Sequence, residues 1–426
     1  MNADVSKEKD DYKVSRIACI FEALFEYFIA ILTSGAYLAK LTSTIGISDA
    51  MTAILSSITS FAGMFQIISI FIAHRTPVKR WILPTVLLMQ ALASTLYTIP
   101  FLKIGAFAPI LFFIIILTTS AAANVVSPAK SNWIYSLVEQ KMRGSFQSKI
   151  STVSIAGGMI FTFIASRTID KYEASGDMSG LFTIITIVIF ILAILQFSCL
   201  LIARERPATY KKASSPFDSI GSLCKNKLFI KVMILNAMWA VATNLTTPFL
   251  ATYQIKELGF SMTFISTVGI GISIVQMFVV SFFGKYSTSH SYASVAKISY
   301  IFALLAFGTL IFTTASNGQI MFTIYRVFNL FFSSASAVCS TCILFAITKP
   351  GETTSAMAFN TIITGLVGFS ATLVASPILT ALQKKEIILF GTQIYAQQIL
   401  ALSSFVMTAL LLTYYLIFCH KGIKEA

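Results

Sequence analysis

The chain has 426 residues, of which 56% are hydrophobic and 11% are charged, and its mean hydropathy is +0.81. Soluble domains carry about a quarter charged residues, so this composition excludes a soluble globular fold. The formal net charge is +14. In a soluble protein that charge would suggest a nucleic-acid partner, but in a membrane protein its position along the chain decides its meaning.

The chain begins with a polar stretch of mixed charge, residues 1–16, for which we expect no cleaved signal peptide. Apolar segments of roughly 20 residues follow, the length that crosses about 30 Å of hydrocarbon. Because they are longer than barrel strands and do not alternate in polarity, we expect an all-α integral membrane protein. The twelve predicted membrane helices are 17–39, 50–73, 81–101, 105–127, 151–169, 181–203, 231–252, 262–283, 295–315, 319–347, 356–381 and 397–418.

The first segment carries two acids, Glu22 and Glu26, within FEALFEYFIAILTSG (21–35). At about 1.5 Å per residue from the inner surface, they lie roughly 9 and 15 Å deep. Their i, i+4 spacing puts both on one helix face, which must avoid lipid. Glu22 is either an acid at the membrane interface, near the cytoplasmic mouth, or a residue that binds substrate or couples protons. Glu26 is either a neutral acid that locks helices together or, since the two acids repel when ionised, part of a pair that holds a proton.

Polar stripes follow three later segments. The fourth has Ser120, Asn124, Ser127 and Ser131, and the seventh has Asn236, Thr243 and Thr247 beside Trp239. The tenth has Arg326, Asn329, Ser333, Ser336 and Ser340 at helical spacing. Arg326 needs an anion, and its candidate partners are Glu26, a substrate anion or helix-end carbonyls, unless it snorkels to the outer interface. Each single Ser or Thr also fits ordinary helix packing.

Cysteine and glycine positions leave alternatives open. Cys339 and Cys342 have a C-x-x-C spacing inside an apolar helix, with no second pair or histidine cluster, so we expect packing residues and no metal site. Gly365 and Gly368, in the eleventh segment, suit either a moving helix or tight packing.

Basic residues predict the orientation. With a cytoplasmic N-terminus, 23 of the 31 lysines and arginines, Lys130 among them, fall on the cytoplasmic side, seven fall outside, and Arg326 lies within a helix. This bias places both termini in the cytoplasm. It accounts for the net charge without nucleic acid.

A polar interruption divides the chain into halves of six helices. We predict a tail at 1–16, a bundle at 17–203, a cytoplasmic loop at 204–230, a second bundle at 231–418 and a tail at 419–426. YLAKLTSTIGISDAMT (37–52) matches FLATYQIKELGFSMT (249–263) at an offset of about 212 residues. Two such repeats of six helices are typical of secondary transporters.

On these residues the chain resembles the major facilitator superfamily. The stretch SNWIYSLVEQKMRGSFQSK (131–149), with Arg143 and Gly144, is similar to a Trp-to-Arg-Gly stretch of a less characterised bacterial subgroup. The superfamily's loop between helices two and three corresponds here to IFIAHRTPVKRW (70–81), which keeps Arg75, Lys79 and Arg80 but has His74 at the aspartate position. That departure puts the conformational latch of this loop in doubt. The resemblance implies that helices one, four, seven and ten line a central cavity.

We therefore expect a secondary active transporter in the bacterial cell membrane, moving a small solute by alternating access with proton coupling. The residues predicted to bind substrate or couple protons are Glu22, Glu26, Arg326, Asn329, Asn124, Asn236 and Trp239. The alternative is a receptor or scaffold that binds a ligand without transporting it. No ATP-binding loop or hydrolase motif is found, so we expect neither an ATP-driven pump nor an enzyme. We also expect a monomer in the lipid bilayer, with no cofactor, no metal and no nucleic acid.

Overall fold

The computed structural model describes residues 12–66, 68, 78–102, 104–139, 142–205, 223–348, 353–385, 387–389 and 392–425. Within these ranges, eleven helices are long and apolar enough to cross a membrane. They correspond to eleven of the twelve predicted segments, and the all-α membrane fold is confirmed. Of the predicted segment 50–73, the structure describes α4 (Asp49–Ala62) and η1 (Gly63–Phe65). Most of its remainder lies outside the described residues.

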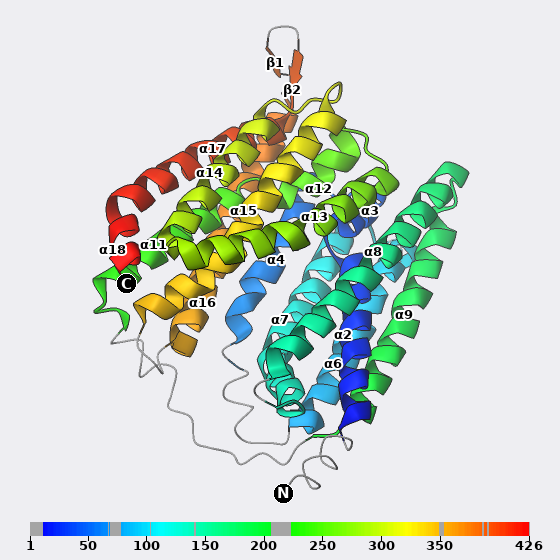
Figure 1. Cartoon of the computed structure of the whole chain (residues 1–426). Coiled ribbons are helices and arrows are strands. Elements are labelled where there is room, and N and C mark those ends of the chain that lie inside the picture. The colour runs from blue at the N-terminus through cyan, green and yellow to red at the C-terminus, as the bar shows by residue number, and fades with distance from the viewer. Residues whose placement is uncertain are drawn as a thin grey trace, which may run out of the picture. The chain divides into compact units, whose positions relative to one another are not determined.

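The helices form two compact units (Figure 1). Unit 1 takes its described residues from Met1–Gly46 and Phe65–Ala213. Its α2 packs against α8 and α9, and α6 packs against α7 and α9. The elements of unit 1 are α2 (Lys13–Thr33), α3 (Gly35–Thr44), α6 (Val78–Thr95), η2 (Leu96–Leu102), η3 (Gly105–Phe107), α7 (Ala108–Ser136), α8 (Arg143–Ser175) and α9 (Met178–Ile202).

Unit 2 takes its described residues from Ile47–Met64 and Ser214–Ala426. In addition to α4, its elements are α11 (Lys227–Asn244), η5 (Thr247–Phe249), α12 (Leu250–Thr252), η6 (Tyr253–Glu257), α13 (Met262–Ser289), α14 (Tyr292–Ile311), α15 (Gly318–Ile347), α16 (Thr353–Gln383), β1 (Ile387–Leu389), β2 (Thr392–Ile394), α17 (Ala396–Tyr414), η7 (Tyr415–Cys419) and α18 (His420–Glu425). Here α14 packs against α15 and α17, and α11 packs against α16 and α17. The strands pair antiparallel, Ile388 opposite Gln393, as a hairpin between α16 and α17 (Figure 1).

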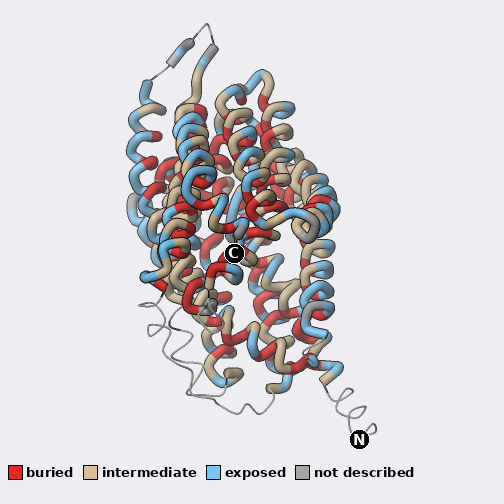
Figure 2. Tube along the Cα trace, turned by 60° about the vertical axis from the view of Figure 1, so that its left-hand side comes forward, coloured by how far each residue is buried: buried red, intermediate tan, exposed pale blue. Residues whose placement is uncertain are grey.

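Buried and exposed residues alternate along the helices (Figure 2), and many of the exposed residues are large and hydrophobic. Ile82 and Trp133 belong to a buried cluster of unit 1, and Leu235 and Tyr415 belong to one of unit 2. Phe278 is 73% exposed. Exposed apolar faces of this kind suit hydrocarbon, in which helices satisfy their own backbone hydrogen bonds.

The helix α4 follows the first membrane helix in sequence, yet it packs within unit 2 along α16, as Figure 1 shows. A Cβ added at Gly365 would lie 2.4 Å from the Ser60 carbonyl oxygen, so the two backbones approach as closely as glycine permits. At the start of α4, Asp49 accepts hydrogen bonds from Lys256 Nζ (2.5 Å) and Gln383 Nε2 (2.8 Å). Side chains from three elements therefore meet at Asp49.

The first helices of the two predicted halves are interrupted at aligned positions. Helix α2 ends at Thr33, Ser34 is extended (φ −139°, ψ 175°), and α3 begins at Gly35 with φ +56°. In the second half α11 ends at Asn244, and Thr246 (φ −123°) precedes η5, whose first turn contains a proline. Ser34 and Thr246 are 212 residues apart, the offset of the internal repeat.

The repeat also has equivalent local geometry at the next turn. Gly46 and Gly259 both adopt positive φ, +77° and +64°. Ser48 and Ser261 are the N-caps of α4 and α13, and each side chain accepts a hydrogen bond from a backbone N–H in the following turn. The sequence match therefore corresponds to a shared backbone conformation. The domain boundaries at 203 and 231 stay a prediction.

The fourth membrane helix is longer than predicted. Helix α7 continues through Pro128 to Ser136, whereas the sequence pattern ended the segment at 127 and assigned Lys130 to the cytoplasmic side. Lys130 lies inside this helix and is 8% exposed, and its assignment to the cytoplasmic side stays a prediction. Proline breaks helices in soluble proteins, but membrane helices tolerate it where neighbouring groups satisfy the freed carbonyl.

Candidate substrate and coupling sites

Unit 1 contains a buried acidic cluster built around Lys130. Lys130 Nζ lies 3.0 Å from Glu22 Oε1 and 2.5 Å from Glu26 Oε2. The i, i+4 spacing of the acids on α2 presents both carboxylates to α7, where the lysine lies. One cation therefore holds two anions between α2 and α7, two of the helices that are long and apolar enough to cross a membrane.

Two glutamines extend this cluster across unit 1. Gln196 Nε2 on α9 donates to Glu22 Oε1 at 2.9 Å, and Gln90 Nε2 on α6 donates to Gln196 Oε1 at 2.8 Å. The cluster, defined as Glu22, Glu26, Lys130, Gln196 and Gln90, thus joins four helices. The hydrogen bonds within the cluster replace those that its buried members would otherwise make to water.

The two acids differ in their surroundings. Glu22 is fully buried, and its Oε2 has no hydrogen-bond partner among the described residues. The Glu26 side chain is 37% exposed. Both acids and Lys130 line a cavity of about 210 Å³. Glu26 is therefore the acid that water reaches, whereas Glu22 is buried and accepts a hydrogen bond from Gln196.

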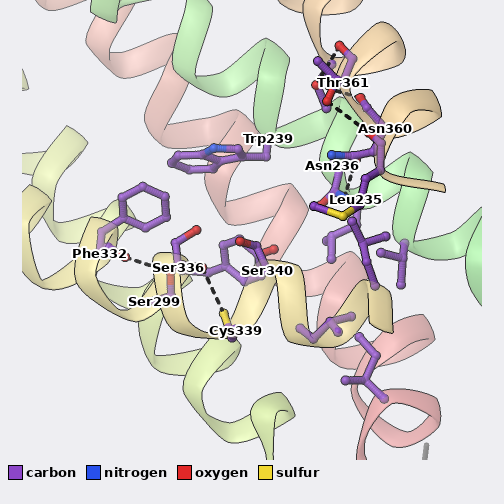
Figure 3. A pocket seen from close by; sticks show the side chains of 17 residues that line it. Leu235, Asn236, Trp239, Ser299, Phe332, Ser336, Cys339, Ser340, Asn360 and Thr361 are labelled. Atoms are coloured by element: carbon purple, nitrogen blue, oxygen red, sulfur yellow. Dashed lines mark hydrogen bonds between the residues drawn. The ribbon is translucent and has the colours of Figure 1, made fainter. Parts of the chain in front are cut away.

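Unit 2 contains a second cavity, of about 340 Å³, lined by side chains of α11, α14, α15 and α16 (Figure 3). Trp239 stands beside Phe332 with ring centroids 4.3 Å apart, and Tyr300 lies 6.3 Å from the same indole. Ser336 and Ser340 lie on the α15 wall of the cavity. No charged side chain of the described residues lines this cavity.

An amide pair lies across the cavity from Phe332. Asn236 Nδ2 on α11 donates to Asn360 Oδ1 on α16 at 2.7 Å (Figure 3). In the part of the chain that the structure describes, the Asn236 oxygen and the Asn360 Nδ2 make no hydrogen bond to protein. If the oxygen and nitrogen of both amides were interchanged, one donor and one acceptor of the pair would still have no hydrogen-bond partner among the described residues. The pair therefore offers a ligand of the cavity one acceptor and one donor.

The structure brings some predicted site residues together and separates others. Glu22 and Glu26 share one cavity, and Asn236 and Trp239 share the other. Asn124 lines neither, because its Nδ2 donates to the Ser120 carbonyl of its own helix at 2.9 Å.

The other two predicted site residues on α15 also lie apart from the cavities. Asn329 lines neither of them. Arg326 is half-buried, and no ion pair or hydrogen bond joins it to another described residue. The anion that Arg326 was predicted to need is therefore not identified. Glu26, one of its candidate partners, pairs with Lys130.

The predicted conformational loop is described in part. His74 and Arg75 lie outside the described residues. Lys79 Nζ donates to the carbonyls of Leu201 (2.6 Å) and Ala203 (2.8 Å) and so attaches the start of α6 to the end of α9.

The remaining loop residues lie at or near helix starts. Arg80 is exposed and follows Lys79 in the first turn of α6. Arg143 Nε donates to the Tyr135 carbonyl at 3.1 Å, and Gly144 lies in the first turn of α8. These contacts attach helix ends to neighbouring segments. They do not test the predicted switching role of the loop.

Sequence reasoning missed Lys130, Gln196 and Asn360. A signal existed for Lys130, because it falls three residues after Ser127 on the predicted polar stripe of the fourth helix. Gln196 and Asn360 are single polar residues within apolar segments, where each has the same pattern as a packing residue.

The model of the Major Facilitator Superfamily matches residues 19–372 of the chain. The chain belongs to the Major Facilitator Superfamily. It is thus a multi-pass membrane transport protein rather than an enzyme, as the sequence predicted. No protein matches among the curated sequences.

Solved transporter structures share the fold. A point mutant of the nucleoside transporter NupG superposes with a TM-score of 0.73 at 13% identity, covering 95% of this chain and 100% of its own. A bacterial homolog of the human lysosomal transporter Spinster gives 0.69 at 15% identity, with 98% of each chain covered. A bacterial metal transporter gives 0.62 at 13% identity, covering 95% of this chain and 97% of its own. At these identities the likeness establishes the fold alone.

Proposed function

We propose that this superfamily member is a secondary transporter that moves a small solute by alternating access and couples it to proton movement. The observation that carries the proposal is the contact of one lysine, Lys130, with two acids inside the membrane-spanning helices. The similar structures include a nucleoside transporter and a metal transporter, which supports a solute carrier.

Charge balance gives the cluster its coupling role. With all three groups ionised, Glu22, Glu26 and Lys130 together carry a single net negative charge. Binding of one proton makes the cluster neutral, and a neutral cluster costs less to hold away from water. The cluster therefore exchanges one proton more readily than an isolated ion pair, whose charges already cancel.

Glu26 is assigned the exchanging proton and Glu22 the anchoring role. The Glu26 side chain is the more exposed of the two, at 37%, and reaches the cavity from which a proton can arrive. Glu22 receives hydrogen bonds from both Lys130 and Gln196, which fix its carboxylate in place. A proton on Glu26 weakens its attraction to Lys130, so protonation changes the contact between α2 and α7.

The test is accumulation in proteoliposomes. Vesicles are given a pH gradient and a defined mixture of nucleosides, monosaccharides, amino acids and organic acids, and their contents are measured by mass spectrometry. We expect the wild type to enrich at least one solute when the gradient is present. Glu26→Gln keeps the size of the side chain but cannot exchange a proton, so it should equilibrate that solute without enriching it.

The matched control is Glu173→Gln. Glu173 also pairs with a lysine, Lys40, but at the end of α8, where its side chain is 51% exposed. This variant should accumulate solute as the wild type does. Gradient-driven enrichment by Glu26→Gln would remove Glu26 from coupling. Failure of the folded wild type to equilibrate any solute would favour the receptor alternative.

A further inference from the structure

We propose that the cavity of unit 2 binds an uncharged planar heterocycle and reads its lactam or imide edge through the Asn236–Asn360 amide pair. That this ring belongs to the transported solute rests on the proposed function. The binding itself does not depend on it. The cavity of unit 2 is defined here by Asn236, Trp239, Phe332, Ser336 and Asn360, among the residues of α11, α15 and α16 that line it.

The charge of the cavity sets the first requirement. Its lining holds amides, hydroxyls and apolar side chains, and no charged side chain among the described residues. A charged ligand group enclosed here would lose its water and gain no counter-ion, at a cost of several kcal/mol. The ligand is therefore uncharged where it contacts this wall.

The amide pair sets the second requirement. Its Asn236 oxygen and Asn360 NH₂ make no hydrogen bond within the described residues, because the other two groups of the pair bond across α11 and α16. A ligand edge that carries an N–H beside a C=O satisfies both at once. Lactams and imides hold this edge rigidly in a ring, whereas an alcohol donates and accepts at one oxygen and an ether only accepts.

The aromatic wall sets the third requirement. The Trp239 indole and the Phe332 ring are 4.3 Å apart and inclined by 37°, with Tyr300 further along the same wall. Figure 3 shows Trp239 and Phe332 on one side of the cavity and the two asparagines on another. A flat ring that stacks on the aromatic side can point its edge toward the amides.

The cavity volume limits the ligand size. About 340 Å³ lies at the low end of the roughly 300–1,000 Å³ found for ligand pockets. One ring or two fused rings with a small hydroxylated substituent fits this volume. The hydroxyls of Ser336 and Ser340, which line the cavity, can bind that substituent.

The experiment measures equilibrium binding to purified full-length protein, with no membrane gradient. Tritiated uridine is the first probe, and tritiated inosine and thymine are tested in parallel. Unlabelled competitors are uridine, N3-methyluridine, uridine monophosphate and glucose. N3-methyluridine removes only the imide N–H, the monophosphate adds charge, and glucose lacks a planar ring.

We expect uridine to compete best. N3-methyluridine should bind about tenfold more weakly, because it leaves one buried acceptor without a donor. The monophosphate and glucose should be weaker still. Asn236→Leu and Asn360→Leu should bind uridine and N3-methyluridine equally, and Trp239→Leu should weaken both ligands together. Trp81→Phe, a tryptophan of unit 1 whose indole N–H has no partner among the described residues, should bind as the wild type does.

Three results would overturn the proposal. The first is equal competition by N3-methyluridine and uridine on the wild type. The second is competition by glucose or the monophosphate as strong as that of uridine. The third is no binding of uridine, inosine or thymine by protein whose thermal unfolding shows that it is folded. Any of these leaves proton coupling at Glu26 untouched, since that is measured by gradient-driven accumulation of whichever solute the vesicles enrich.

Discussion

Lys130 is the cation of a buried group with two carboxylates, and its removal should be costly. Lys130→Met keeps the length of the side chain but leaves Glu22, which is 1% exposed, without a counter-ion. Breaking a buried ion pair from one side costs about 3–5 kcal/mol. We expect a clearly lower unfolding temperature of the purified protein in detergent, measured by a thermal shift.

Two companion variants decide what that loss means. Lys130→Met combined with Glu22→Gln removes both charges and should recover much of the lost stability. Lys40→Met breaks the ion pair with the exposed Glu173 and should cost about 0–1 kcal/mol. Equal losses for Lys40→Met and Lys130→Met would argue against a buried charge cluster.

At the residue scale the sequence predicted the acids but not their partner. The spacing of Glu22 and Glu26 already required a polar neighbour, since neither could face lipid. Lys130 was missed because Pro128 marks a helix end in most sequences, and only the surrounding helices show that α7 continues through it. Pairing of polar groups between helices depends on tertiary packing, which no single segment contains.

At the scale of secondary-structure elements, the close packing of α4 on α16 depends on one glycine, Gly365. Gly365→Ala would place its Cβ 2.4 Å from the Ser60 carbonyl oxygen, a backbone atom that cannot swing aside. Overpacking of this kind typically costs about 1–3 kcal/mol. We expect the variant to unfold at a lower temperature than the wild type.

Gly269→Ala is the matched control. Gly269 also lies inside a membrane helix, α13, but a Cβ there would meet no atom within 4 Å. Because alanine favours helices over glycine by up to about 1 kcal/mol, this variant should be as stable as the wild type or more so. A drop of equal size in both variants would mean that glycine acts through the helix backbone and not through the α4–α16 contact.

The elements themselves were predicted more fully than their grouping. Segment length and hydropathy gave eleven described membrane helices at the expected places, because the bilayer sets both properties. That α4 packs with α16 in unit 2 could not be predicted, since it depends on contacts such as that of Asp49 with Gln383, which lie far apart in sequence.

The orientation of the whole molecule is testable with Cys224, which is exposed in the segment before α11. The positive-inside rule puts that segment in the cytoplasm. A membrane-impermeant maleimide should therefore label Cys224 in inside-out vesicles but not in right-side-out vesicles, as read by mass shift.

A second position checks the other side of the membrane. Ser175, exposed at the end of α8, is predicted to lie outside. In a Cys224→Ser background, Ser175→Cys should show the opposite labelling pattern. Labelling of both positions from the same side would contradict the predicted topology.

The paired interruptions near Ser34 and Thr246 have a consequence for the ancestry of the chain. One is made by a left-handed glycine, Gly35, and the other by a proline within η5. If both halves descend from one duplicated segment, then the place of the interruption was inherited while the residues that produce it were replaced. The halves therefore share at this position a break in the helix and not one backbone geometry, since Ser34 is extended (ψ 175°) and Thr246 is not (ψ −47°).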